Sequence, residues 1–263
     1  MDLDKETVIH EELKKKLDKV LEFCIDVNNT QLEEKEREKE KDKEKERNHI
    51  KIREELNKKL EKVLEYKKKS NSIYCNLLVI DNFYNNAMET RKYVLTQDFK
   101  VRGNYPGQRT ESHANLHLKT MIEGYISHFA GKITKWPLEK EAYNGAFQYT
   151  TSRDRTWIHN DEWNNWAGVL YLTPNAPVTS GTGIYRFNDG TRTSIEAEAY
   201  GKTELLNTNS QDYTKWELVD RIGNIFNRLI LFNSKQYHAS QDYFGTTKED
   251  GRLFQVFFFT TEI

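Results

Sequence analysis

The sequence predicts an α+β protein in which a helical, highly charged N-terminal arm, residues 1–70, precedes a strand-rich domain, residues 71–263. Two observations indicate this division. The arm holds a repeated amphipathic pattern, whereas the aromatic residues, 12% of the chain, are concentrated after residue 70. The later part carries short segments of β-branched and aromatic residues, which are typical of strands. With 263 residues and 37% hydrophobic content, the chain can form one sizeable core plus an appendage.

Charge, cysteine content and hydropathy exclude several classes of protein. A formal net charge of −1 gives no global field that would hold nucleic acid or an anionic membrane. Cys24 and Cys75 fall in different regions, so they offer no disulfide framework, and this suits a reducing interior. No apolar stretch approaches the length of a membrane span, and residues 1–6 lack a secretory-signal pattern. We therefore expect a soluble, cytoplasmic protein with no membrane partner.

The arm contains an internal repeat, because residues 11–23 recur as residues 54–66. Apolar residues step by four and three in both copies, at Leu13, Leu17 and Val20 and at Leu56, Leu60 and Val63. This spacing predicts the seam of a short coiled coil, within one chain or in a homo-oligomer. Residues 33–47 between the copies are almost wholly charged and support only a solvated helix. A solvent-exposed helical spacer and, less favoured because acidic residues interleave throughout, a nucleic-acid partner stay open as alternatives.

The strand-rich domain is expected to begin with a strand over residues 73–80 and a helix over residues 87–95, capped by the polar segment before it. A second helix is expected over about residues 115–129. The positions of His113, His117 and His128 suit that helix better than a metal site. The turn-rich segment 103–110 places an aromatic residue near a cation, and we favour a structural turn over a functional loop because glycine and proline make turns in many contexts.

The strongest chemical signal lies between His159 and Arg252. His159 and Asp161 are two residues apart, so on one straight strand their side chains would leave the same face. His238 lies at a polar turn after the apolar segment 225–232. Two imidazoles and one carboxylate can ligate a single metal. On one face of an octahedron they leave positions open for a bidentate co-substrate and O₂.

Arg252 opens an apolar segment that runs to residue 259. In a strand, residues 252, 254, 256 and 258 share one face, so the guanidinium would enter an apolar interior. There its planar fork of donors can bind a carboxylate bidentately, and the low dielectric strengthens the interaction. The alternative is a structural salt bridge to an acidic residue in the preceding turn, Asp242, Glu249 or Asp250.

In these features the chain resembles the Fe(II)/2-oxoglutarate-dependent dioxygenases, most nearly the prolyl-4-hydroxylase-like subgroup. The likeness is carried by His159-x-Asp161, a strand over residues 167–173, a small-residue step at 180–183, and His238 with Arg252 downstream. It covers about residues 146–263 and, more faintly, the chain from residue 79. The resemblance implies a double-stranded β-helix, or jelly roll, with buttressing helices, in which a strand over residues 146–151 leads to the ligand pair.

The resemblance also implies roles for individual residues. His159, Asp161 and His238 would be the iron ligands at the catalytic centre, and Arg252 would hold the distal carboxylate of 2-oxoglutarate. Tyr149 is an approximate counterpart of a tyrosine that contacts the co-substrate. The implied cofactors are Fe(II), 2-oxoglutarate and O₂, with ascorbate as an optional reductant. The implied reaction is hydroxylation of an unidentified substrate, with a protein side chain favoured over a nucleobase or small molecule.

Two segments near the predicted site leave alternatives open. Residues 188–224 are expected to form an excursion between core strands, either a lid or a surface insertion. Residues 162–166, an acidic, aromatic and amide cluster, either recognise a substrate or cover the rim of the barrel.

Two other functional classes compete with the dioxygenase. A non-catalytic coiled-coil plus β-barrel interaction protein is less favoured because all four site residues are intact. A Zn²⁺ hydrolase with three protein ligands and a water accounts for the triad but leaves Arg252 without a role.

Overall fold

The computed structural model describes residues 14–16, 19, 21, 40–62 and 75–263. The contacts between Cα atoms divide the chain into two compact units, Met1–Leu60 and Glu61–Ile263. The predicted boundary near residue 70 lies outside the described residues. Within the described ranges, no helix has the length and apolar character needed to cross a membrane.

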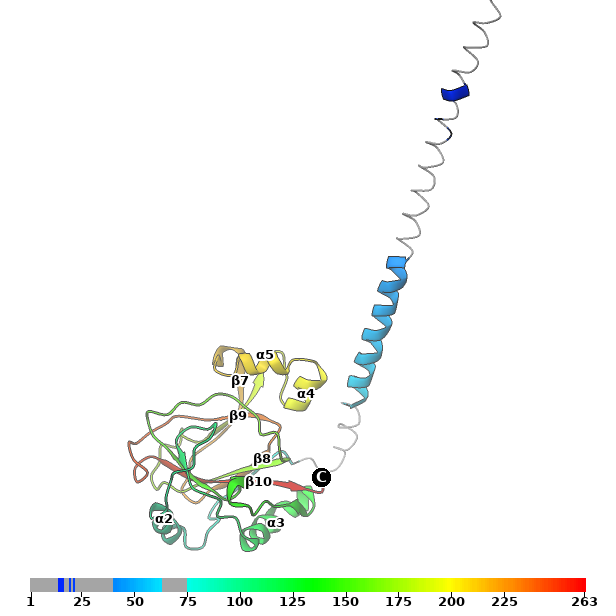
Figure 1. Cartoon of the computed structure of the whole chain (residues 1–263). Helices are drawn as coiled ribbons and strands as arrows, with labels where there is room; N and C mark the ends of the chain where they lie inside the picture. The colour runs from blue at the N-terminus through cyan, green and yellow to red at the C-terminus, as the bar shows by residue number, and fades with distance from the viewer. Residues whose placement is uncertain (1–13, 17–18, 20, 22–39, 63–74) are drawn as a thin grey trace, which may run out of the picture. The chain divides into compact units, whose positions relative to one another are not determined.

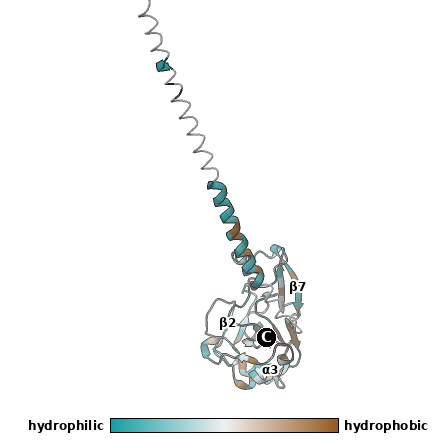
Figure 2. Cartoon of the chain, turned by 90° about the vertical axis from the view of Figure 1, so that its right-hand side faces the viewer, coloured by the Kyte–Doolittle hydropathy of each residue, from teal (hydrophilic) through white to brown (hydrophobic). Residues whose placement is uncertain are grey.

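Residues 40–62 form a helix, and Figure 2 shows that most of this helix is hydrophilic. Its apolar side chains are exposed, at 55% for Ile52, 59% for Leu56 and 54% for Leu60. Of the predicted coiled-coil seam the structure describes Leu56 and Leu60, which pack against no described residue, whereas Leu13, Leu17, Val20 and Val63 lie outside the described residues. Helix formation here is consistent with the dense alternation of opposite charges, which stabilises a helix without burying it. Pairing through the seam stays a prediction.

The second unit contains two antiparallel sheets. In the main sheet the strands lie in the order β1 (Leu77–Ile80), β8 (Leu229–Asn233), β5 (Trp166–Tyr171), β10 (Arg252–Thr261), β4 (Phe147–Thr150) and β2 (Gln108–Arg109), and β3 (Ile133–Lys135) pairs with β10. In the small sheet the order is β7 (Trp216–Ile222), β6 (Thr182–Phe187) and β9 (Tyr237–Ser240). All the pairings are antiparallel.

The chain passes back and forth between these sheets. From β4 in the main sheet it passes to His159, which bridges to β9 of the small sheet, and then returns to the main sheet as β5. It crosses to the small sheet as β6 and β7, back as β8, over again as β9, and ends in the main sheet as β10. Such winding of one antiparallel ribbon into two facing sheets is a double-stranded β-helix, so the predicted jelly roll is confirmed in the arrangement of the strands.

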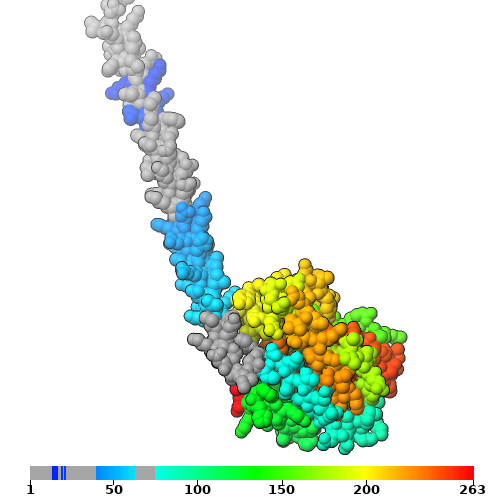
Figure 3. All heavy atoms as spheres, turned by 180° about the vertical axis from the view of Figure 1, so that it is seen from behind, coloured from blue at the N-terminus to red at the C-terminus, as the bar shows by residue number. Residues whose placement is uncertain are grey.

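Two helices cover the outer face of the main sheet (Figure 1). Helix α2 (Ala87–Leu95) has the predicted bounds, and α3 (Leu116–Ala130) begins one residue after its cap, Asn115, whose side chain accepts a hydrogen bond from the Leu118 backbone N–H at 2.9 Å. Figure 3 shows the α2 and α3 segments on one face of the molecule. Their buried residues join those of the sheet in one cluster that includes Val94, Ile122 and Phe257.

Strand β10 divides its side chains between this outer cluster and the interior between the sheets. Leu253, Phe257 and Phe259 belong to the helix side, whereas Phe254 and Val256 belong to the inner cluster. Because side chains alternate along a strand, Arg252 lies on the inner face with Phe254 and Val256, as the sequence predicts. The apolar surface that β10 buries on both faces contributes about 1.5–3 kcal/mol per large side chain.

Residues 188–224 contain two short helices, α4 (Ser194–Ala199) and α5 (Thr203–Thr208), and then β7. A capping box between Thr193 and Glu196 begins α4. The expectation that this whole segment is an excursion is wrong for its second half, because β7 is a strand of the small sheet paired with β6. The five residues between Trp216 and Ile222 are exposed, so β7 lacks the apolar run that marks the other strands.

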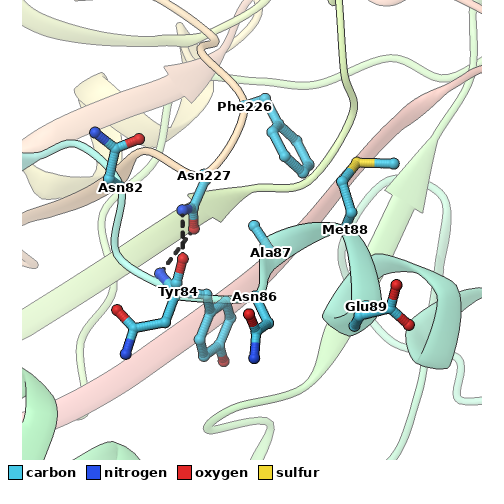
Figure 4. Close-up of a pocket in the computed structure, with 9 residues that line it drawn as sticks. Asn82, Tyr84, Asn86, Ala87, Met88, Glu89, Phe226 and Asn227 are labelled. Atoms are coloured by element: carbon cyan, nitrogen blue, oxygen red, sulfur yellow. Dashed lines mark hydrogen bonds between the residues drawn. The ribbon is translucent and has the colours of Figure 1, made fainter.

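A surface pocket lies where the segment before α2 meets the turn before β8 (Figure 4). The Asn227 side chain joins these segments, accepting from the Tyr84 backbone N–H and donating to the Tyr84 carbonyl, both at 2.8 Å. Asn227 has a positive φ of 64°. These bonds satisfy the backbone groups of Tyr84, so Asn227 has a structural role at this edge of the main sheet.

Candidate metal centre

The structure brings His159, Asp161 and His238 together, as the sequence predicts. One ligand atom from each residue lies within 4.8 Å of the others. His159 and His238 exchange two backbone hydrogen bonds, of 3.0 and 2.8 Å, which place a ring from each chain segment on the same side. The Asp161 backbone N–H donates to the Ser234 carbonyl at 2.8 Å and so holds the carboxylate beside the rings. Among the described residues this is the one group of three or more metal-binding side chains.

Backbone carbonyls determine which nitrogen of each ring carries the proton. Nδ1 of His159 lies 3.0 Å from the Trp157 carbonyl oxygen, and Nδ1 of His238 lies 2.9 Å from that of Gln236. A carbonyl oxygen only accepts hydrogen bonds, so each Nδ1 carries the hydrogen. The Nε2 lone pair of both imidazoles is then free to bind a metal, and the carbonyls act as the outer partners that orient metal-bound histidines.

The charges at the site also favour a bound cation. Burial, and then the neighbouring His238, lowers the pKa of His159 to about 4. Burial acts to raise the pKa of Asp161, but the contact with His238 and the neighbouring groups His159 and Arg109 outweigh it, so the pKa lies below the ordinary 3.8. At neutral pH the site therefore holds a neutral imidazole and a carboxylate, the protonation states that bind a metal.

One distance within the triad shows how closely two of the ligands approach each other. Nε2 of His238 lies 3.3 Å from Oδ2 of Asp161. Since Nδ1 of His238 already carries a hydrogen, two lone pairs face each other at this distance unless a proton or a metal ion lies between them. Two imidazole nitrogens and one carboxylate oxygen form the donor set of non-heme iron sites, and the residues fit such a metal.

Arg252 is 1% exposed and has no acidic partner among the described residues. Its Nε donates to the Ser180 carbonyl at 2.9 Å and its Nη2 to the Gly181 carbonyl at 3.2 Å. The guanidinium carbon lies 4.3 Å from the ring centroid of Phe254 and 5.3 Å from that of Tyr171. Burial lowers the pKa of Arg252.

No salt bridge to Arg252 is found in the part of the chain that the structure describes. Asp242 pairs with Arg221, with 3.8 Å between Nη2 and Oδ2, and Asp250 accepts hydrogen bonds from the Thr246 and Thr247 backbone N–H groups. The predicted alternative of a structural ion pair therefore has no support here. A buried guanidinium with only neutral partners leaves much of its charge uncompensated.

Three polar atoms around Arg252 are buried and form no hydrogen bond of normal geometry, namely its own Nη1, Oγ1 of Thr150 and Oη of Tyr243, which has the Thr156 and Ser240 side chains beside it. Thr150 lies opposite Arg252 in the pairing of β4 with β10, so both side chains are on the inner face. Tyr243 is close enough to affect the pKa of Arg252. Buried polar atoms are rarely left unsatisfied, and together these three can accommodate an anionic, oxygen-rich ligand.

Thr150, Tyr171 and Tyr243 also belong to this pocket, and none of them was predicted from the sequence as a site residue. Tyr171 is fully buried, and its hydroxyl lies 2.8 Å from Oγ1 of Thr182. Strand alternation could have predicted the inward direction of Tyr171, because Tyr171 pairs with the inward-facing Phe254. No pattern in the sequence marks Tyr243, which lies outside the regular strands.

Tyr149 does not lie with the other four predicted site residues. It pairs with Leu253, so its side chain leaves the outer face of the main sheet. There its ring packs edge-on against Phe99, with 5.1 Å between ring centroids, in the cluster beneath the helices. The inner face at this position is occupied by its neighbours Gln148 and Thr150.

Comparison with solved structures finds several similar chains. HygX from Streptomyces hygroscopicus, with nickel and 2-oxoglutarate bound, is 13% identical over 72% of this chain and 84% of its own, with a TM-score of 0.46. A Trichoplax adhaerens prolyl hydroxylase in complex with a hypoxia inducible factor peptide is 14% identical over 80% and 92%, with a TM-score of 0.43. The non-heme alpha ketoglutarate dependent carbocyclase SnoK from nogalamycin biosynthesis is 12% identical over 70% and 79%, with a TM-score of 0.45.

No curated protein matches the chain. A family model does match it, over residues 62–259, and this range spans both sheets, α2, α3 and all the residues of the candidate metal centre. The model describes a family of unknown function, DUF6445. The chain belongs to the family DUF6445.

Proposed function

We propose that this protein is an Fe(II)- and 2-oxoglutarate-dependent dioxygenase. The observation that carries the proposal is the presence, in one double-stranded β-helix, of a His-Asp-His metal site and a buried arginine with no acidic partner among the described residues. A metal site alone has many uses. A second, separate site for a carboxylate on the inner face of the same barrel is the arrangement that a chelating dicarboxylate co-substrate requires.

His159, Asp161 and His238 would hold the metal, with Nε2 of each imidazole as donor. Arg252 would hold the far carboxylate of 2-oxoglutarate through Nη1, with Thr150 and Tyr243 supplying the hydroxyls that form no hydrogen bond of normal geometry. When bound, iron with 2-oxoglutarate and O₂ supplies the oxidising chemistry that yields succinate, CO₂ and a hydroxylated product. Ascorbate is included in the proposal as an accessory reductant.

The chain itself supplies position and environment. The carbonyls of Ser180 and Gly181 fix the guanidinium of Arg252 from one side, and the ring of Phe254 covers it. These contacts leave Nη1 as the free donor, so the direction of carboxylate approach is determined before any ligand binds. The apolar inner cluster around Phe254 and Val256 keeps bulk water from this charge and strengthens its interaction with an anion.

The finer assignment, to the prolyl-4-hydroxylase-like subgroup, rests on the sequence features from His159 to Arg252. A protein side chain as the substrate rests on analogy with that subgroup alone. Between the other classes, a Zn²⁺ hydrolase accounts for the triad and leaves the buried Arg252 without a function. A non-catalytic interaction protein accounts for neither. The dioxygenase gives both sites a role.

The test is metal and co-substrate binding by the full-length protein, followed by succinate formation in air. We expect one Fe(II) per chain and 2-oxoglutarate binding that requires the metal. Arg252→Lys keeps a positive charge but cannot be held by the Ser180 and Gly181 carbonyls while it also presents a fixed N–H to the carboxylate. It should therefore weaken 2-oxoglutarate binding about tenfold or more while retaining iron. His238→Ala should lose iron and succinate formation together.

Arg91→Lys is a matched control. Arg91 is also a buried arginine that donates to two backbone carbonyls, those of Leu172 and Glu249, but it belongs to α2. Its substitution should lower stability and leave 2-oxoglutarate affinity unchanged. Metal binding without any affinity for 2-oxoglutarate would indicate the hydrolase instead, and full iron occupancy in His238→Ala would contradict the metal assignment.

A further inference from the structure

A second buried arginine lies in the same barrel. Arg109, in β2, is 6% exposed and forms no ion pair in the described ranges. Its Nε donates to Oε1 of Gln148 at 2.8 Å, and its Nη2 donates to the same oxygen. The guanidinium carbon lies 3.7 Å from the ring centroid of Tyr105 and 4.9 Å from that of Tyr143. All its contacts are therefore with neutral groups.

The position of Arg109 is on the metal side of the main sheet. It pairs with Gln148 across β2 and β4, and Gln148 pairs with Phe254 of the inner cluster, so the three side chains share the inner face. The charge of Arg109 contributes to lowering the pKa of Asp161, and that of Asp161 acts to raise the pKa of Arg109. Arg109 and the carboxylate ligand therefore act on each other through their charges.

The contacts around Arg109 are fixed before any ligand binds. Nε2 of Gln148 donates to the Pro106 carbonyl at 2.6 Å, and Oη of Tyr105 donates to the Val101 carbonyl at 3.0 Å. The Gln148 oxygen occupies the edge of the guanidinium formed by Nε and Nη2. The opposite edge, with both hydrogens of Nη1, has no partner in the described part of the chain, and the guanidinium lies over the half-buried rings of Tyr105 and Tyr143.

No carboxylate in the described part of the chain forms an ion pair with this guanidinium, although the charge of Asp161 acts on it. Burial lowers the pKa of Arg109 to about 10. Aromatic faces and one amide oxygen compensate only part of this cost. An oxyanion bound at the free edge would form charge-assisted hydrogen bonds in a site that is already desolvated.

We propose that Arg109, with Tyr105, Tyr143 and Gln148, binds an anionic oxygen group of the primary substrate, a carboxylate or a phosphate, beside the metal centre. The role in substrate recognition rests on the proposed function, whereas anion binding at Arg109 does not. Arg252 serves the co-substrate and Arg109 the substrate. The acidic group would select the substrate and hold it at a fixed distance from the metal.

The experiment uses benzoate as the probe, with benzamide as its neutral counterpart and inorganic phosphate as the tetrahedral oxyanion. Each is titrated by calorimetry into the full-length protein loaded with Zn²⁺ and saturated with 2-oxoglutarate, so that Arg252 is occupied. We expect benzoate or phosphate to bind and benzamide not to bind. Arg109→Gln should weaken the anion that binds about tenfold or more, with 2-oxoglutarate affinity unchanged.

Arg252→Lys is the reciprocal variant, because it should weaken 2-oxoglutarate and leave the anion affinity unchanged. That pair of results separates the two proposals. Anion binding that requires Arg109, in a protein that does not turn over 2-oxoglutarate, would overturn the dioxygenase assignment and leave the anion site standing. Arg102→Gln, which removes an exposed cation from the same loop, should change neither affinity.

If Arg109→Gln does not fold, Gln148→Glu tests whether Arg109 binds the anion. The new carboxylate would lie at the position of Oε1 and pair with Arg109 internally, so the external anion should no longer bind while 2-oxoglutarate affinity is retained. The proposal is overturned if neither benzoate nor phosphate binds the unmodified protein. It is equally overturned if Arg109→Gln or Gln148→Glu, with normal 2-oxoglutarate affinity, binds the anion as tightly as the unmodified protein does.

Discussion

At the scale of single residues, the candidate metal centre makes the metal-free protein sensitive to acid. The pKa of His159 is lowered from 6.5 to about 4, mainly by burial. Between these two values the unfolded chain binds a proton that the folded protein does not, so stability rises with pH across this window and is complete above it. The pKa of Asp161 is also lowered, so its contribution is lost only as the pH falls through still lower values.

We predict that the metal-free protein loses about 1–3 kcal/mol of its free energy of unfolding between about pH 7 and about pH 4.5 because of His159. In His159→Gln this part of the loss should disappear. The measurement is urea unfolding of chelator-treated protein at several pH values. Burial lowers the pKa of His113 too, so some pH dependence will persist in the variant. Identical slopes in the two proteins would contradict the assignment to His159.

At the scale of elements, the start of β6 links the fold to the arginine pocket. A Cβ atom added to Gly181 would lie 1.8 Å from the Ile222 carbonyl oxygen, because β6 and β7 approach closely at this point. The Gly181 carbonyl also accepts from Nη2 of Arg252. The small residues at 180–183 therefore serve two purposes. They allow the strands to approach closely, and they orient the guanidinium of Arg252.

Gly181→Ala is expected to lower the free energy of unfolding by about 1–3 kcal/mol through overpacking, and to weaken 2-oxoglutarate binding because the Arg252 contact moves. Denaturant unfolding and co-substrate titration measure the two effects. Gly124→Ala is the control. Gly124 lies within α3 with no atom near its added Cβ, so alanine should stabilise the protein by about 0.5–1 kcal/mol. A stable Gly181→Ala protein with unchanged 2-oxoglutarate affinity would show that Gly181 is needed neither for strand packing nor for the position of Arg252.

At the scale of the whole molecule, the unit Glu61–Ile263 contains the core clusters and both candidate binding sites. The apolar side chains of the helix over residues 40–62 are exposed and contribute no buried surface there. The family model begins at residue 62, close to the same boundary. The stability of the second unit should therefore not depend on the arm.

We predict that a chain of residues 61–263 unfolds cooperatively, with the same dependence of free energy on denaturant as the corresponding transition of the full-length protein. Circular dichroism during urea unfolding is the measurement. Sedimentation of the two chains tests the separate prediction that the seam mediates self-association, since only the full-length chain would then form oligomers. A gradual, non-cooperative transition in the shorter chain would show that the arm belongs to the core.

The sequence predicted those parts of the fold that depend on local pattern. Helix α3 follows from its Asn115 cap and its apolar spacing, and α2 has the predicted bounds although Asn86 before it makes no side-chain capping hydrogen bond. The inward direction of Arg252 follows from strand alternation in β10. The triad was predictable because each ligand is attached to a recognisable segment at a characteristic spacing. Strand β7 was not, because its exposed residues carry no apolar pattern and its pairing with β6 alone makes it a strand.

Only the tertiary structure decided which side chains meet. Tyr149 and Thr150 are adjacent in sequence, yet they lie on opposite faces of the main sheet. The register of β4 against β10 places Tyr149 beneath the helices and Thr150 opposite Arg252. Arg109 lies in a turn-rich segment with no sign of burial, and its place on the inner face comes from two pairs with β4. Residue types and spacing determined the chemistry that this chain can perform. Strand register determined where each group lies, because a shift of one residue exchanges the two faces of a sheet.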